Sequence, residues 1–200
     1  MKKFFRASLL LCATLFFFLL LLLFFLLYSY TRWQGEFENS MLEQNTVSPD
    51  SVKDVDIQEK ITDFVLSMEY TESLELELEE IGAILFDVID DYLGDGIHLT
   101  SIYIIPKHGR WDLFLKLSYK KIYLWISCDV NKDEMQTAQL YITDIYVGPF
   151  SMRGYSKWVE KVNRGIADSI VTLNENGFVG RYLENIELLE SNIVVKGSRY

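Results

Sequence analysis

An uninterrupted apolar run near the start of the chain begins at Ala7, ends at Leu27 and contains no charged residue. A helix of this length rises about 32 Å, enough to cross the hydrocarbon core of a bilayer. The basic residues Lys2, Lys3 and Arg6 precede the run, and the amphipathic rings of Tyr28, Tyr30 and Trp33 follow it. Because basic residues favour the cytoplasmic side and such rings favour the membrane interface, we expect a transmembrane helix with a cytoplasmic N-terminus.

Two other interpretations of this run are a cleavable signal peptide and a lipoprotein signal. A signal peptide has an apolar core of about 7–15 residues and a small-residue cleavage site after it. This run is longer, and it continues through residues 27–30 without such a site. A lipoprotein signal would end at Cys12, but Leu11 stands where a small residue is expected. The sequence therefore favours an uncleaved anchor over residues 1–33.

A polar segment follows the anchor. Residues 34–51 mix Gly, Glu, Asn, Ser, Thr and Pro without a stable period, which indicates a linker. The chain from Glu36 to Asp95 has Lys53 and Lys60 as its only basic residues. This acidic charge would hold the linker away from an anionic lipid surface. An ordinary solvated spacer explains the composition as well.

The rest of the chain, residues 52–200, has the patterns of one folded domain. Leu74, Leu76 and Leu78 alternate with glutamates, a period of two that predicts a strand. From Ile81 to Tyr92 the apolar residues recur at steps of three and four, which predicts an amphipathic helix. Residues 57–68 are amphipathic but short, and the pattern there does not choose between helix and strand.

Alternation continues downstream. Further strands are predicted over residues 99–105, 111–119, 122–130, 139–147, 182–188 and 192–196, with a helix over 155–170. The segment 122–130 has Tyr and Trp on one face and aliphatic residues on the other, which predicts a central strand. Short connections favour antiparallel neighbours. We therefore expect an α+β fold: a transmembrane helix, then one domain in which an antiparallel sheet of about six to seven strands packs against two amphipathic helices.

Composition narrows the class of protein. With 50% hydrophobic residues the chain is too apolar for a disordered protein, and its net charge of -10 argues against a nucleic-acid partner. Two cysteines, one inside the apolar run, cannot form a disulfide framework. The other, Cys128, shares a strand face with Ile126 and Val130, so we expect a buried, unpaired thiol.

Residues for catalysis are sparse. The histidines are His98 and His108, and no zinc-binding spacing is present. Ser118 and Lys121 match the S-x-x-K spacing of some serine nucleophiles. That motif works at the start of a helix, where the lysine faces the serine one turn on, whereas here it ends a predicted strand.

A metal site is equally unsupported. The stretch from Asp129 resembles the opening of a calcium loop, but Glu134 stands at position six, where glycine is needed, and Leu140 at position twelve offers no carboxylate. A hairpin turn explains these residues. No glycine-rich loop follows a strand to bind phosphate. We therefore expect no enzyme activity, no metal and no cofactor.

The aromatic content of the domain is high and has two interpretations. The rings can fill a core between the sheet and its helices. Alternatively, they can surround an apolar cavity between the sheet and the 155–170 helix. Its lining residues would be Trp125, Phe150, Trp158 and Val162.

Three stretches of the domain carry a resemblance to a known family. Leu76, Leu78 and Ile81 lead from a strand into a helix, residues 140–150 end a strand in Val-Gly-Pro-Phe, and residues 186–197 form a closing hairpin. With the anchor, this order resembles the YpmS-type family of single-pass bacterial envelope proteins. The layout is also similar to that of tubular lipid-binding modules, in which a long helix lies in a curved sheet over an acyl cavity.

Two functions remain as hypotheses. The first is an extracytoplasmic domain, anchored in the cell (inner) membrane, that binds a lipid or another apolar envelope ligand between its sheet and its long helix. The second is a non-enzymatic scaffold or assembly factor, whose anchor and outer strand edges contact a membrane protein partner.

Overall fold

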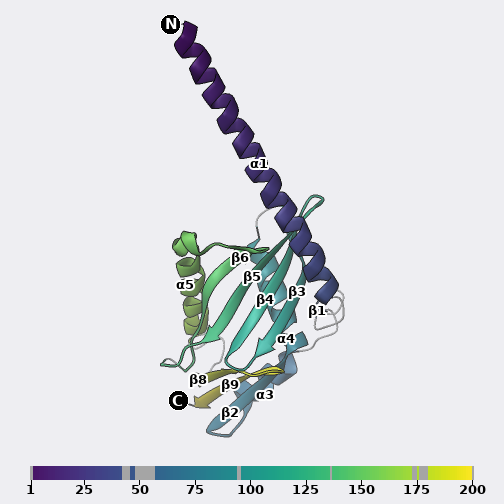
Figure 1. Ribbon diagram of the computed structural model, residues 1–200. Helices are drawn as coiled ribbons and strands as arrows, with labels where there is room; N and C mark the ends of the chain where they lie inside the picture. The colour runs from purple at the N-terminus through teal and green to yellow at the C-terminus, as the bar shows by residue number, and fades with distance from the viewer. Residues whose placement is uncertain are drawn as a thin grey trace. The chain divides into compact units, whose positions relative to one another are not determined.

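The computed structural model describes residues 2–41, 46–47, 57–93, 96–135, 137–172, 175 and 180–199. The chain divides into two compact units, Met1–Leu42 and Glu43–Tyr200. The first contains helix α1 (Lys2–Met41), and the second contains strands and further helices (Figure 1). The predicted α+β class with antiparallel strand pairing is confirmed.

Helix α1 is long and apolar enough to cross a membrane. It runs past Trp33 into the segment predicted as a linker, where three pairs of side chains one helical turn apart contribute to its stability. These pairs are Arg32 with Glu36, Trp33 stacked on Phe37, and Gln34 with Glu38. Apart from the helical residues and strand β1 (Thr46–Val47), the predicted linker lies outside the described residues.

The second unit follows the predicted order of elements closely. Its elements after β1 are α3 (Gln58–Leu66), β2 (Thr71–Glu77), α4 (Leu78–Tyr92), β3 (Ile97–Lys107), β4 (Arg110–Tyr119), β5 (Ile122–Lys132), β6 (Leu140–Val147), β7 (Phe150–Ser151), η1 (Arg153–Tyr155), α5 (Ser156–Thr172), β8 (Arg181–Leu188) and β9 (Asn192–Arg199). The segment left open between helix and strand is thus the helix α3. Strand β5 lies centrally, between β4 and β6, as predicted.

The prediction of a single sheet packed against two helices is wrong. The strands form a six-stranded sheet, β1-β3-β4-β5-β6-β7, and a three-stranded sheet, β2-β9-β8. Strand β2 pairs with β9, with Leu74 opposite Val195, so it joins the C-terminal hairpin. Because this pairing connects segments far apart in the sequence, local periodicity does not reveal it. In the described residues, α3, α4 and α5 accompany these sheets.

The core lies on one face of the long sheet. Ile102 and Ile104 of β3 and Trp111 of β4 are almost completely buried there. The indole N–H of Trp111 donates to the carbonyl of Leu189 at 2.8 Å, and the Gly109 N–H donates to the carbonyl of Leu188 at 2.8 Å. These bonds join the three-stranded sheet to the long sheet at the turn between β3 and β4. Figure 1 shows β8, β9 and β2 at this end of the long sheet.

Candidate functional site

The four predicted lining residues lie in two different environments. Trp125, on β5, is buried, and Phe150, on β7, is half-buried. Trp158 and Val162, on α5, are 65% and 39% exposed. The structure therefore places two of the four under cover and leaves two open to solvent, and the cavity between sheet and helix stays a prediction.

A single side chain fastens α5 to the outer edge of β6. The Ile142 N–H donates to Asn163 Oδ1 at 2.7 Å, and Asn163 Nδ2 donates to the Ile142 carbonyl at 3.0 Å. Strand β7 covers this edge only at Tyr146 and Val147. Asn163 therefore satisfies the backbone N–H and carbonyl of Ile142, as a further strand would, and protects this part of the open sheet edge. Sequence reasoning missed Asn163, because its position on the helix gives no signal for an edge contact.

Beyond this contact α5 packs only shallowly. None of its residues is buried, and all of them are described. The apolar residues Val159, Ile166 and Ile170 are half-buried, while Trp158 lies open to solvent. The amphipathic pattern of the helix is therefore confirmed, but the domain covers its apolar residues only in part.

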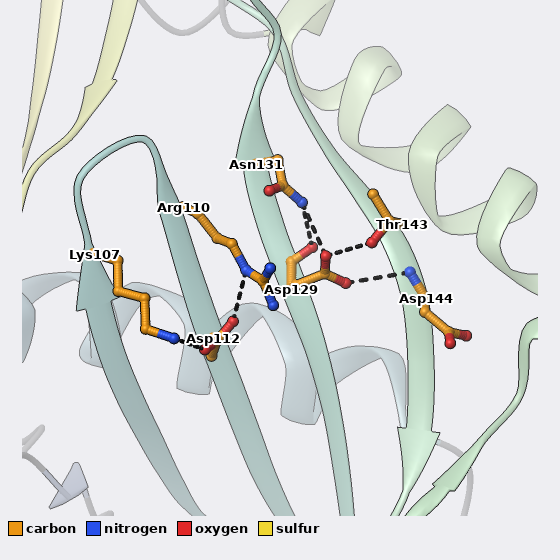
Figure 2. A network of polar contacts seen from close by, with 7 residues as sticks. All are labelled: Lys107, Arg110, Asp112, Asp129, Asn131, Thr143 and Asp144. Atoms are coloured by element: carbon orange, nitrogen blue, oxygen red, sulfur yellow. Dashed lines mark hydrogen bonds and ion pairs between the residues drawn. The ribbon is translucent and has the colours of Figure 1, made fainter.

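A row of three carboxylates crosses the face of the long sheet opposite the core (Figure 2). Asp112 on β4 pairs directly with Asp129 on β5. Asp144 lies next to them on β6, where the register between β5 and β6 shifts at Asp129. This shift is a β-bulge, and bulges are frequent near functional sites. The row is therefore a second candidate site.

Chain donors satisfy the most central carboxylate, Asp129, which is buried. Its oxygens accept hydrogen bonds from the Asn131 side chain at 3.1 Å, from the Thr143 hydroxyl and from the Asp144 N–H at 3.2 Å. Burial raises the pKa of Asp129, but the hydrogen bonds from Thr143, Asn131 and the backbone outweigh it, so this pKa lies below its usual value. Asp129 is therefore ionised at neutral pH.

The flanking carboxylates are satisfied in the same way. Asp144 accepts from the Ile145 N–H at 2.8 Å and from the Ser151 hydroxyl, which ties β6 to β7. Asp112 pairs with Lys107 Nζ at 2.7 Å and Arg110 Nε at 3.0 Å. Each of the six carboxylate oxygens thus has a donor from the chain. The row therefore holds the bulge and the neighbouring turns in place.

This geometry does not resemble a metal or nucleophile site. Within the part of the chain that the structure describes, no group of three His, Cys, Asp or Glu residues could hold a metal ion. Cys128 is a free thiol, as expected, but half-buried rather than buried. Burial first, then the charges of Asp129 and Asp112, raise its pKa to about 12, which keeps it protonated at neutral pH. The Ser118 hydroxyl lies 3.4 Å from the carbonyl of His98, at the end of a strand.

Comparisons with protein-family models, curated proteins and solved structures find no match to this chain. The resemblance to the YpmS-type family therefore rests on the three stretches of its sequence and stays a prediction.

Proposed function

We propose that this chain is a membrane-anchored, non-enzymatic domain that binds a lipid or another apolar envelope ligand alongside α5. Helix α1 serves as the anchor. Its basic N-terminal tip stays in the cytoplasm, and the second unit lies outside the cell membrane. Helix α1 is retained after export, since no small-residue cleavage site follows its apolar run.

The observation that supports ligand binding is the uncovered apolar surface of α5. A helix of 17 residues with an amphipathic pattern ordinarily buries its apolar stripe, because burial of apolar area is the main favourable term in folding. Here no residue of α5 is buried, and Trp158 is 65% exposed. A ligand with an acyl chain would cover this surface, and Trp158 and Val162 would be its first contacts.

Native mass spectrometry of residues 43–200, purified without detergent, tests this function, followed by organic extraction of bound molecules. We expect a stoichiometric adduct of lipid mass that is lost in Trp158→Glu. Since Trp158 lies open to solvent, this substitution leaves the fold intact. Lys161→Ala, on an exposed position of the same helix, is the matched control and should retain the adduct.

A bare protein mass from the folded domain would contradict the lipid-binding function. An adduct that persists in Trp158→Glu would place the ligand elsewhere and contradict the role of α5. Circular dichroism of both variants confirms that any loss of ligand comes from the binding surface and not from unfolding.

A scaffold for a membrane protein complex is the second candidate, favoured by a separate apolar patch. Leu66, at the end of α3, and Met68 and Tyr70, between α3 and β2, are 67%, 87% and 70% exposed. Strand β2 is an edge of its sheet and is therefore open to pairing with another chain. Crosslinking in membranes, with Met68→Asp as the variant, tests this candidate. A specific protein adduct that Met68→Asp abolishes would favour the scaffold.

A further inference from the structure

The tip of the β4–β5 hairpin, residues 119–123, exposes apolar and cationic side chains together. Ile122 is 67% exposed, Tyr123 50% and Tyr119 47%. Tyr119 pairs with Ile122, so Lys120 and Lys121 form the two-residue turn between them, and both are exposed. Large apolar side chains at a solvent-exposed turn are unusual and indicate a contact surface.

The backbone of this tip supports the same conclusion. Lys120 has φ 56°, a left-handed conformation that favours glycine or asparagine. A lysine at this position costs stability that a glycine would not. The chain therefore keeps a cation at a strained position, and such strain is frequent at functional sites.

The two strands of the hairpin contribute basic residues near the tip. Between Asp112 and Asp129 the two strands contain Lys116, Lys120 and Lys121 and no acidic residue, in a chain whose net charge is -10. Lys120 Nζ lies 5.1 Å from the ring centre of Tyr119, and Lys116 Nζ lies 5.3 Å from that of Tyr123. By the strand register, Tyr119 and Ile122 lie on one face of the hairpin and Lys116 and Tyr123 on the other, so rings and ammonium groups occur on both faces of the tip.

We propose that this tip contacts the headgroup region of an anionic bilayer. Ile122 and the two tyrosine rings enter the interface, where amphipathic rings are favoured, and the lysines approach the lipid phosphates. Charge complementarity favours this occupant, because anionic lipids attract the cationic tip. The chain as a whole is net acidic and is repelled by the same surface, so the tip is the part that approaches it. The contact would fix the orientation of the domain over the membrane.

The proposed anchor brings the second unit to a membrane surface. The inference rests on the anchoring part of the proposed function, and it does not depend on the ligand at α5.

Site-specific fluorescence of the full chain in vesicles tests the contact. The vesicles contain phosphatidylcholine with about one third phosphatidylglycerol and a doxyl-labelled lipid as quencher. A polarity-sensitive probe is attached at Ile122→Cys in a Cys12→Ser background. Met135→Cys is the matched control, because Met135 is 95% exposed in the loop at the other end of β5. The half-buried Cys128 thiol, with its raised pKa, reacts poorly with the probe.

We expect the lipid quencher to reduce the emission of the Ile122 probe several-fold more than that of the Met135 probe. Lys120→Gly removes one cation and relieves the backbone strain, so it weakens the contact without unfolding the hairpin. This substitution should lower the equilibrium constant for the contact between the tip and the membrane about fivefold. Pure phosphatidylcholine vesicles should weaken the contact further.

Equal quenching at the two positions would overturn the tip contact. Strong quenching at Ile122 that is unchanged by Lys120→Gly and by removal of phosphatidylglycerol would overturn the choice of an anionic surface. Flotation of the vesicles is measured first. A chain that does not float with them contradicts the anchor, whereas a floating chain without selective quenching contradicts the tip contact alone.

Discussion

Two regions of the domain are built from similar residues but bury them to different extents. The closed region consists of α3 and the sheet β2-β9-β8, and the open region consists of α5 and the outer edge of β6. Helix α3, with nine residues, buries Phe64 at 2% exposure, whereas α5, with 17, buries none. An amphipathic pattern therefore predicts a helix, but it does not predict how far the rest of the domain buries the apolar residues of that helix. We infer that the closed region determines stability and that the open region is available for binding.

The contacts of the closed region explain its cohesion. Arg181, on β8, is completely buried and donates to the carbonyls of Ser67 and Glu69 at 2.9 Å and of Gly197 at 3.1 Å. Its guanidinium carbon lies 5.3 Å from the ring centre of Phe64. One side chain thus joins the α3–β2 turn to the C-terminal hairpin. In the open region, the two hydrogen bonds of Asn163 join α5 to β6.

Arg181→Met should give the largest loss of stability, because it leaves three carbonyls without their donor. Loss of hydrogen bonds from a charged group predicts a decrease of about 3 kcal/mol in the free energy of unfolding. Urea unfolding of residues 43–200 measures it. Arg164→Met, which removes an exposed ion pair with Glu160 on α5, is the control and should change stability by less than about 0.5 kcal/mol. Equal effects of the two substitutions would remove the distinction between the regions.

Gly197→Ala tests how tightly the closed region is packed. A Cβ at this position would lie 2.8 Å from Phe64 Cζ and 3.2 Å from the Tyr182 carbonyl oxygen. Such overpacking should destabilise the domain by about 1–3 kcal/mol. In a Phe64→Leu background the ring edge is absent, so the same substitution should cost less. A double-mutant cycle measures this coupling, and a coupling energy of zero would show that the ring does not limit the site.

The sequence predicted the strands of both regions but not which strands pair with one another. Alternation of Leu and Glu around Leu74 and Leu76 indicated β2, and the closing hairpin was expected from residues 182–196. Pairing of β2 with β9 depends on contacts between distant segments, which local periodicity does not contain. Arg181 was missed because an arginine at the start of a strand ordinarily lies on the surface. Its hydrogen-bond partners are also distant in the sequence, so local periodicity does not indicate them.

The sequence predicted the helix and the strand of the open region, but it did not predict how exposed the residues of the helix are. The apolar residues Trp158, Val162 and Ile166 correctly indicated a helix, and Trp158 was expected to line a cavity between this helix and the sheet. The structure instead leaves Trp158 exposed, because Asn163 holds α5 at the edge of β6. Hydrophobicity identifies which residues avoid water, but the position of a helix beside a sheet depends on single polar contacts.

Asn163→Leu should detach α5 while leaving the closed region intact. The two bonds to Ile142 are lost, which predicts a decrease of about 1–2 kcal/mol in the free energy of unfolding. Hydrogen exchange should accelerate at the Ile142 amide and in α5, and stay unchanged in β9. Lys161→Leu, with similar helix propensity and an exposed position, is the control. Uniformly faster exchange in both regions would show that they unfold as one unit.

The smallest expected effect is a pH dependence at Asp129, beside the open edge. Its pKa is lower in the folded chain than its usual value, so folding favours the ionised form. The stabilisation is therefore present above the unfolded pKa of about 3.9 and is lost as pH falls through the folded pKa. Urea unfolding between neutral and acid pH, in the wild type and in Asp129→Asn, isolates this contribution, since the other carboxylates titrate in both. The stability difference should narrow below about pH 4, and a constant difference would contradict the ionised hydrogen-bonded state.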